Sequence, residues 1–371
     1  MVTSRPVIER MEIRGFRSIR SQSIDLTRLN VMIGANGAGK SNLISYFAFL
    51  RATLNGNMES YIGRHGGPNS VLYLGAKFTR ELASRITMNT PVGRGTFFQR
   101  LGFRAPDSLY FDPNHAGRSN GTDRSDEMTI NGYASIIKDP SIGEGHPGLL
   151  IHTSLMDRLG IYHFHDTSLT SPLRTECYVE DNLQLRADGG NLAAMLYLYA
   201  KNHQMIFDRI GRTISKIVPQ FDRFELEPQR LNPNNILLNW RQKGSDYLFG
   251  PHQLSDGSLR AMALVTLLLQ PMNSLPDIIA LDEPELGLHP HAIELIAGLI
   301  RAASETSQMI VAVQSQSFLD HFDPSEVLVV ETSSDGTQFK RLEPEKLELW
   351  LEDYSLADLW QRNVIGGGPI P

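Results

Sequence analysis

The chain of 371 residues contains a single cysteine, Cys177, and its acidic side chains outnumber the basic ones to give a formal net charge of -6. One cysteine excludes an intramolecular disulfide and a cysteine-based zinc site, and it suits a reducing compartment. The acidic balance argues against a broadly basic nucleic-acid-binding surface, while leaving room for a local basic patch. A hydrophobic content of 41% is that of a soluble globular protein.

Long apolar runs, internal repeats, heptads and low-complexity tracts are also missing. The longest apolar stretch, residues 261–269, is far shorter than the roughly 18 residues that a transmembrane helix needs. Residues 1–9 lack the apolar core of a signal peptide. We therefore expect a cytoplasmic protein without membrane contact, folded as one large or two ordinary domains.

A glycine-rich segment from Gly34 to Ser41 fits the pattern G-x-x-x-x-G-K-[ST] at all four fixed positions. Residues 29–33 have the pattern of a short buried strand, and residues 42–50 that of the helix that follows. In this setting, backbone N–H groups and the helix N-terminus would bind a nucleotide phosphate. Lys40 would reach the β- and γ-phosphates, and the Ser41 hydroxyl would bind Mg²⁺. A glycine-rich turn without a nucleotide is the alternative, and the flanking strand and helix disfavour it.

A second motif is an apolar strand, residues 277–281, that ends in the adjacent carboxylates Asp282 and Glu283. Asp282 would bind Mg²⁺ directly or through water, and Glu283 would orient and polarise the attacking water. Taken alone, these two residues could equally form an ordinary exit from a strand into a turn. The phosphate loop upstream favours the catalytic interpretation.

A third motif, residues 254–258, opens a helix that runs to about Leu269. Ser255 and Gly257 at this helix N-terminus would form a second anion-binding site. Ser255 could also be only an N-cap, with Asp256 favourable in the first helical turn. The motif is weak by itself, and its position shortly before the paired carboxylates makes it specific.

Elsewhere the pattern predicts an α/β protein whose last third alternates strands and helices, which indicates a parallel sheet. Residues 72–137 mix short alternating segments with turn residues, so antiparallel strands are expected there. The other expected elements are edge strands at 7–14 and 21–26, a helical region at 191–218, strands at 221–226 and 236–240, a helix at 289–303, and strands at 308–313 and 326–331.

These motifs together resemble those of the ABC-type ATPases, in particular the RecF/SMC-like branch and the AAA-labelled relatives found among OLD-family and antiphage defence proteins. The segments that carry the resemblance are the Walker A motif at 34–41, the signature Leu-Ser-Asp-Gly-Ser at 254–258, the Walker B motif at 278–284, a D-loop with a GLHP ending at 285–290, and a first strand at 13–18. Segments 162–168, 185–192 and 350–367 are also similar to the stand-alone branch, so the resemblance covers nearly the whole chain.

The resemblance implies one P-loop ATPase head over residues 1–371, with a mixed sheet lobe, a helical signature lobe and no long coiled coil. Its parts would be an N-terminal sheet with Walker A (1–70), inserted strands and helical lobe (71–250), and a part with the signature and Walker B (251–371). It further implies a homodimer that sandwiches two ATP molecules with Mg²⁺. Ser255 and Gly257 would then touch the γ-phosphate bound by the partner.

The site residues follow from this assignment. Glu283 and Gln314 are the expected catalytic residues, and Ser41 and Asp282 the expected metal ligands. The residues expected to bind the nucleotide are Asn36, Gly37, Ala38, Gly39, Lys40, Ser41, Asn42, Arg17, Ser255 and Gly257.

Three positions depart from the family pattern or leave an alternative open. Gln314 stands where the family usually has a switch histidine, and it cannot take up a proton as imidazole would. It could still hydrogen-bond the γ-phosphate or the lytic water, which predicts slow hydrolysis, or it could only cap its strand. Arg17 would contact base or phosphate, or else be a solvated strand residue. No Q-loop glutamine can be assigned, although Gln99 lies in a plausible turn region.

His163 and His165 alternate with apolar neighbours, which on a strand would direct both imidazoles to the same side. A metal pair is conceivable. No third ligand has suitable spacing, so structural histidines are favoured.

The resulting hypothesis is an ATP-driven sensor or motor in DNA repair or antiphage defence, in which ATP closes a homodimer and hydrolysis reopens it. There is no room for a C-terminal TOPRIM nuclease, so a nuclease or toxin would be a separately encoded effector. The alternative is a nucleotide-gated scaffold that holds such an effector while hydrolysis is incidental. A transporter ATPase fits less well because of the long insertion between Lys40 and Ser255. DNA binding and any oligomer beyond a dimer stay open.

Overall fold

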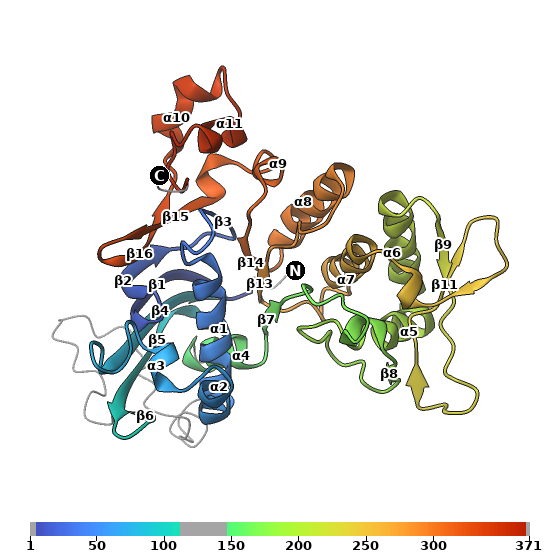
Figure 1. Cartoon of the computed structure of the whole chain (residues 1–371), viewed down its shortest axis with the longest axis horizontal. Coiled ribbons are helices and arrows are strands. Elements are labelled where there is room, and N and C mark those ends of the chain that lie inside the picture. The colour runs from blue at the N-terminus through green and yellow to red at the C-terminus, as the bar shows by residue number, and fades with distance from the viewer. Residues whose placement is uncertain (1–4, 112–146, 369–371) are drawn as a thin grey trace.

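A six-stranded sheet forms the centre of the computed structural model, which describes residues 5–111 and 147–368 (Figure 1). Its strand order is β16-β15-β3-β14-β13-β7, and all neighbours are parallel except the edge strand β16. Helices or a second sheet cover both faces, which is why β3, β13 and β14 are almost continuously apolar. The strands are β3 (Leu29–Ile33), β7 (Leu159–Tyr162), β13 (Ile278–Asp282), β14 (Gln308–Ala312), β15 (Val327–Ser333) and β16 (Gly336–Arg341).

A second sheet of five antiparallel strands has the order β2-β1-β4-β5-β6. Its strands are β1 (Val7–Phe16), β2 (Ile19–Asp25), β4 (Glu81–Thr90), β5 (Gly93–Arg104) and β6 (Ser108–Phe111). The antiparallel strands expected after residue 72 are thus confirmed as far as residue 111, and residues 112–137 of that prediction lie outside the described residues. The prediction that 7–14 is an edge strand was wrong, because β1 lies between β2 and β4.

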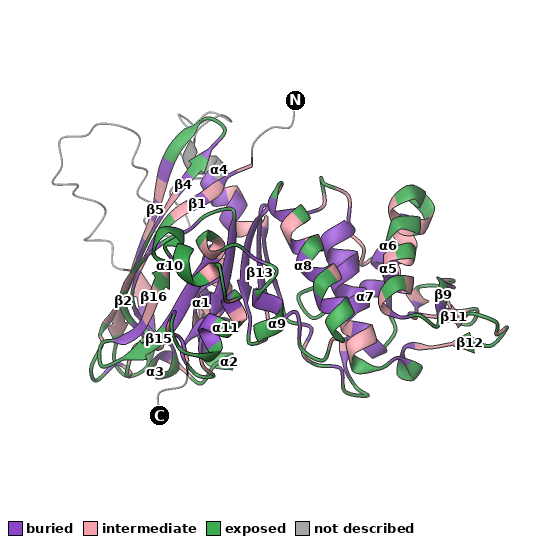
Figure 2. Cartoon of the chain, turned by 90° about the horizontal axis from the view of Figure 1, so that it is seen from above, coloured by how far each residue is buried: buried purple, intermediate pink, exposed green. Residues whose placement is uncertain are grey.

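Helix α1 (Lys40–Leu54) packs between the two sheets. Its buried Tyr46 and Phe49 meet Phe16 of β1 at ring-centroid distances of 5.4 and 5.6 Å. The same core contains Ile278 and Ala280 of β13. Helices α2 (Met58–Arg64), α3 (Pro68–Val71) and α4 (Pro147–Met156) complete this side of the molecule, and Figure 2 shows how strongly its interior is buried.

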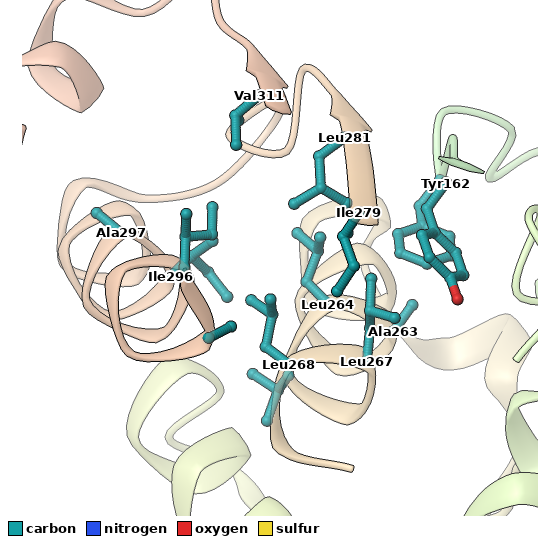
Figure 3. Packing of buried hydrophobic residues seen from close by; sticks show 14 of the residues in the cluster. Tyr162, Ala263, Leu264, Leu267, Leu268, Ile279, Leu281, Ile296, Ala297 and Val311 are labelled. Carbon is teal, nitrogen blue, oxygen red and sulfur yellow. The ribbon is translucent and has the colours of Figure 1, made fainter. Parts of the chain in front are cut away.

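Helices α7 (Asp256–Leu269) and α8 (Pro290–Ser304) cover the opposite face of the six-stranded sheet. Figure 3 shows Leu264 and Leu267 of α7 against Ile279 of β13, with Ile296 of α8 in the same cluster. Alternate residues of β13 therefore enter different cores, as the two-residue period of a strand requires. The burial on both faces fixes the position of Asp282 at the strand end.

A helical lobe extends from α7. It contains α5 (Leu192–Asn202), α6 (Gln204–Ile217) and two small sheets, and its strands are β8 (Cys177–Tyr178), β9 (Phe221–Phe224), β10 (Asn235–Ile236), β11 (Trp240–Gln242) and β12 (Leu248–Phe249). The helical region expected at 191–218 is interrupted at His203, whose φ of -140° is not helical. The strand expected at 236–240 is divided between β10 and β11, which belong to different sheets.

The C-terminal part adds α9 (Gln316–Leu319), α10 (Pro344–Leu351) and α11 (Leu356–Gln361). The remaining predicted elements correspond to β2, β3, α1, β9, α7, β13, α8, β14 and β15. Within the described ranges the longest helices have 15 residues, so this part of the chain has no long coiled coil. None of the helices that the structure describes is both long and apolar enough to span a bilayer.

Candidate nucleotide site

The polar residues singled out in the sequence gather where β3, β14 and β13 end. Val31 of β3 pairs with Val311 of β14, and Val311 with Leu281 of β13, so the carboxyl ends of the three strands are level. In α/β sheets this edge is where ligands bind. The structure brings five predicted residues to it, namely Lys40, Ser41, Asp282, Glu283 and Gln314.

The phosphate loop is braced on one side and uncovered on the other. Gly39 has φ of 111°, and a Cβ there would lie 2.3 Å from the Thr337 hydroxyl, so only glycine fits. The Thr337 hydroxyl also donates to the Ala38 carbonyl at 3.0 Å. Asn36 and Gly37 are exposed, and a Cβ on Gly37 would meet nothing within 4 Å. The loop therefore has room for a ligand against its exposed backbone.

Lys40 lies folded against its own loop. Its ammonium donates to the Gly34 carbonyl at 2.5 Å and to the Ala35 carbonyl at 3.3 Å. Burial lowers the pKa of Lys40, and the nearby carboxylates of Glu283 and Asp282 oppose that shift. Within the described residues its ammonium makes no direct ion pair and bonds only two loop carbonyls, so it is available to an anionic ligand.

Ser41 and Asp282 join the start of α1 to the end of β13. The Ser41 hydroxyl donates to Oδ1 of Asp282 at 3.2 Å. Hydroxyl and carboxylate oxygens are ligands that Mg²⁺ prefers. Residues 5–111 and 147–368 contain no group of three or more His, Cys, Asp or Glu side chains that could hold a metal ion. The pair could therefore hold Mg²⁺ only together with phosphate and water oxygens, which is the usual Mg²⁺ arrangement.

Glu283 has a backbone conformation that non-glycine residues seldom adopt, with φ of 47°. Its N–H donates to the Ala312 carbonyl of β14 at 2.8 Å, and its carboxylate accepts a hydrogen bond from the Gln314 side-chain amide. Such a conformation costs about 1–3 kcal/mol, and residues of this kind cluster at active sites. In this conformation the Glu283 carboxylate lies beside the Gln314 amide.

Glu285 opens the D-loop-like segment, and no sequence motif indicates the role of its side chain. It is buried, and its Oε1 accepts from the backbone N–H groups of Gln314 at 2.6 Å and Ser315 at 3.0 Å. Its other carboxylate oxygen has no partner in the described residues. Burial raises the pKa of Glu285, and the two N–H donors oppose the shift. Glu285 thus ties the segment after β13 to the loop after β14.

The signature-like segment lies directly against the D-loop-like segment. Ser255 is the N-cap of α7, and its hydroxyl accepts from the Ser258 N–H at 3.2 Å. A Cβ on Gly257 would lie 2.2 Å from the Gly287 carbonyl, so this contact requires glycine. No hydrogen bond or ion pair described in the structure joins Ser255 or Gly257 to the phosphate loop of the same chain.

Two arginines that the sequence analysis missed hold this region in place. Arg174, which is 4% exposed, donates to Asp256 at 2.8 Å and to the Leu254 carbonyl at 3.1 Å. The hydrogen bond from Arg174 is the main reason that the pKa of Asp256 is lowered. Arg260 on α7 donates to the carbonyls of Phe164 and Leu286, both at 3.0 Å. Neither residue belongs to a local motif, so only the fold reveals them.

Arg17 and Asn42 both join α1 to the turn between β1 and β2. Arg17 lies in that turn and donates to the Ser45 hydroxyl at 2.8 Å, so the alternative of a solvated strand residue was wrong. Asn42 donates to the Ser18 hydroxyl at 2.6 Å. Ser18 lies 2.7 Å from the Thr337 hydroxyl, which bonds the Ala38 carbonyl, so the Asn42 side chain braces the phosphate loop through two hydroxyls.

His163, His165 and Gln99 lie in other settings than expected. β7 ends at Tyr162, so both histidines belong to the following loop and not to a strand. Tyr162 pairs with Leu281, which puts His163 level with Asp282. Partial burial lowers the pKa of His163, and the nearby Asp282 carboxylate opposes this shift. Gln99 is buried within β5, where its amide donates to the Tyr46 hydroxyl at 3.2 Å, and so does not lie in a turn.

Sheet order, phosphate loop and paired carboxylates together define an ABC/SMC-like P-loop ATPase fold. The family model described as "AAA domain, putative AbiEii toxin, Type IV TA system" matches residues 29–320, and the chain belongs to this family. No curated protein matches the sequence.

Solved structures similar to this chain include Smc head domains. One, a head bound to the C-winged helix domain of ScpA, is 15% identical, with a TM-score of 0.61 over 92% of this chain and 99% of the other. A head from Pyrococcus furiosus with an extended coiled coil and the C-terminal domain of ScpA is 15% identical, with a TM-score of 0.61 over 94% and 99%. A head from Pyrococcus yayanosii with a coiled coil and joint is 12% identical, with a TM-score of 0.58 over 94% and 99%. At these identities the likeness establishes the fold alone.

The contact between Gly257 and Gly287 predicts a position-specific cost of adding one methyl group. Gly257→Ala should lower the free energy of unfolding by about 1–3 kcal/mol, because the new Cβ meets a backbone carbonyl. Gly211→Ala in α6 is the matched control, since its Cβ would meet nothing within 4 Å. Denaturant unfolding of both variants measures the difference, and equal effects would contradict the contact.

The buried Glu285 predicts a pH-dependent effect on stability. Because its pKa is raised on folding, the wild type loses stability as pH rises from the unfolded value of 4.5 through the folded pKa. Glu285→Gln keeps an oxygen for the two N–H donors and stays neutral. The difference in melting temperature, variant minus wild type, should therefore increase as the pH is raised from about 5 to about 8. Exposed Glu59→Gln is the control, and a difference that is flat or falls with pH would contradict the prediction.

Proposed function

We propose that the protein binds and hydrolyses ATP, and that ATP closes a homodimer which hydrolysis reopens. The observation that carries the proposal is the convergence of Lys40, Ser41, Asp282, Glu283 and Gln314 at the level ends of three parallel strands. A phosphate-binding lysine, two oxygen ligands and a carboxylate beside an amide are what phosphoryl transfer to water requires.

In this proposal each side chain has a separate task. Lys40 leaves its loop carbonyls to bind the phosphates, beside the backbone of residues 36–39. Ser41 and Asp282 would hold Mg²⁺, which when bound neutralises charge on the phosphate oxygens. Glu283 accepts a hydrogen bond from the attacking water and polarises it. Gln314 donates to Glu283 and so orients the carboxylate; Arg17 is proposed to contact the nucleotide from the turn between β1 and β2.

The homodimer is proposed because, in the described residues, no hydrogen bond or ion pair joins Ser255 or Gly257 to the phosphate loop of the same chain. Ser255 and Gly257 would instead complete the site of a partner, and the half-exposed Leu286 would line the seam. The chain would act as one ATPase head, with residues 1–70, 71–250 and 251–371 as its parts. The cytoplasm is the proposed location.

For the biological role we propose a sensor or motor in DNA repair or antiphage defence, acting with a separately encoded effector. Two similar Smc heads are described as bound to ScpA domains, which supports a protein partner. A nucleotide-gated scaffold with slow hydrolysis is the second candidate. It is favoured by one observation, that Gln314 contacts Glu283 where a proton-accepting imidazole is absent.

The hydrolytic role predicts that Glu283→Gln lowers the ATPase rate by about a hundredfold or more while nucleotide binding persists. Phosphate release with and without double-stranded DNA, together with binding of a fluorescent ATP analogue, measures both. Exposed Glu305→Gln is the control.

Unchanged turnover in Glu283→Gln would remove Glu283 from its role. DNA stimulation would favour the motor or sensor, and a slow rate indifferent to DNA would favour the scaffold.

The shared site predicts that two inactive variants restore activity when mixed. Lys40→Ala and Ser255→Arg each disable both sites of their own homodimer, yet a mixed dimer retains one intact site. Equal mixing should therefore recover about a quarter of the wild-type rate if chains exchange freely and the sites are independent. If Ser255 served its own phosphate loop, the mixture would have only the summed activity of the two variants.

A further inference from the structure

A groove of about 670 Å³ lies between α6 and α8, away from the nucleotide site. Arg209, Arg212 and Lys216 line it from α6, and Leu295, Gly298 and Leu299 from α8. Figures 1 and 2 show α6 and α8 in the half of the molecule that contains the helical lobe. The groove is therefore a surface separate from the strand ends that hold Lys40 and Asp282.

Three unneutralised cations follow one side of this groove. Arg209, Arg212 and Lys216 are exposed and stand at i, i+3 and i+7, which puts them on one face of α6. Their side chains have no hydrogen bond or ion pair in the part of the chain that the structure describes. Arg301 at the same groove, in contrast, is paired with Glu326 at 3.0 Å. Like charges at this spacing repel one another, so an anionic ligand would relieve a cost.

The floor of the groove is apolar and open. Leu295 and Leu299 are half-buried, and a Cβ on Gly298 would meet nothing within 4 Å. A glycine inside a helix is less favourable than alanine, and here it leaves the floor without a side chain. The one carboxylate of the lining, Glu294, lies 3.9 Å from His291. An amphipathic acidic helix would use the cations and this floor together, whereas a phosphate backbone would use only the cations.

Helix α10 of the chain has the complementary character. Glu345, Glu348 and Glu352 are exposed there, beside Leu349 and Trp350, which are 80% and 46% exposed. The eight residues of α10 extend about 12 Å, and the cations from Arg209 to Lys216 span about 10.5 Å along α6. Both views of the molecule separate α10 from α6, so contact between them needs two copies (Figures 1 and 2).

We propose that α10 of one copy docks in the groove between α6 and α8 of another copy. Leu349 and Trp350 cover the apolar floor, and the glutamates face the cations of α6. The contact joins different surfaces on the two copies, so it adds further copies beside any symmetric dimer. The docking involves none of the residues at the nucleotide site and does not depend on ATP.

The first test uses a fluorescein-labelled peptide of residues 342–355 as the probe, with the full chain titrated in and anisotropy recorded. Saturable binding is expected, and Arg209→Glu/Arg212→Glu/Lys216→Glu should weaken it by about tenfold or more. Reversal of three other exposed cations, Lys77, Arg230 and Lys340, is the matched control and should leave the affinity within about twofold. Absence of peptide binding, or equal losses in both variants, would overturn the proposal.

A steric variant separates docking from general charge effects. Gly298→Met puts a side chain on the floor at a position where a Cβ meets nothing within 4 Å, and it should abolish peptide binding. Gly211→Met, at the other open glycine of these two helices, should retain it. Both replace a helical glycine, so neither should unfold the protein. Sedimentation velocity of the full chain should show concentration-dependent association that Gly298→Met removes.

A charge swap completes the test. Glu345→Lys/Glu348→Lys/Glu352→Lys should lose self-association, and mixing it with the Arg209→Glu/Arg212→Glu/Lys216→Glu variant should restore association between the two. Failure of this rescue would overturn the proposal. Absent peptide binding would overturn the proposal, and duplex DNA that binds the wild type but not Arg209→Glu/Arg212→Glu/Lys216→Glu would assign the cations of the groove to nucleic acid instead.

Discussion

The level ends of β3, β14 and β13 are the constraint on which the rest of the candidate site depends. Parallel pairing aligns Ala312 with Met32 on one side and with Asp282 on the other. Residues that are far apart in the sequence thereby leave the sheet at one edge. Burial of both sheet faces prevents a slip of register, because a shift of one residue would move every apolar side chain to the wrong core. The polar site is thus positioned by apolar packing.

The sequence predicts well those features whose chemistry is contiguous along the chain. Lys40 and Ser41 stand in a loop whose backbone must itself form the phosphate site, so the pattern is visible in eight consecutive residues. Glu285 and Arg174 escape such reasoning because each acts through burial and through partners from distant segments. His163 shows a third limit, since its position depends on where β7 ends, and a strand boundary is poorly determined by local pattern.

The two carboxylates after β13 have opposite environments, and this division follows from local geometry. Glu283 is held in a strained conformation by its N–H bond to Ala312 and keeps its carboxylate in contact with an exposed amide. Glu285, two residues later, enters the protein and anchors the backbone of Gln314. One segment therefore supplies both the carboxylate proposed to polarise water and the side chain that braces Gln314. The cost of burying Glu285 is partly offset by the hydrogen bonds that its Oε1 accepts from the N–H groups of Gln314 and Ser315.

Arg260 extends this bracing across the helical lobe. Its guanidinium bonds the carbonyls of Phe164 and His165 after β7 and of Leu286 in the segment after β13. Five donors in a planar fork allow one arginine of α7 to hold two backbone segments through three carbonyls. Since Gly257 on the same helix touches Gly287, the start of α7 and the D-loop-like segment have little freedom to move separately. A change in the position of Leu286 must therefore be transmitted to α7, which links the two motifs mechanically within one chain.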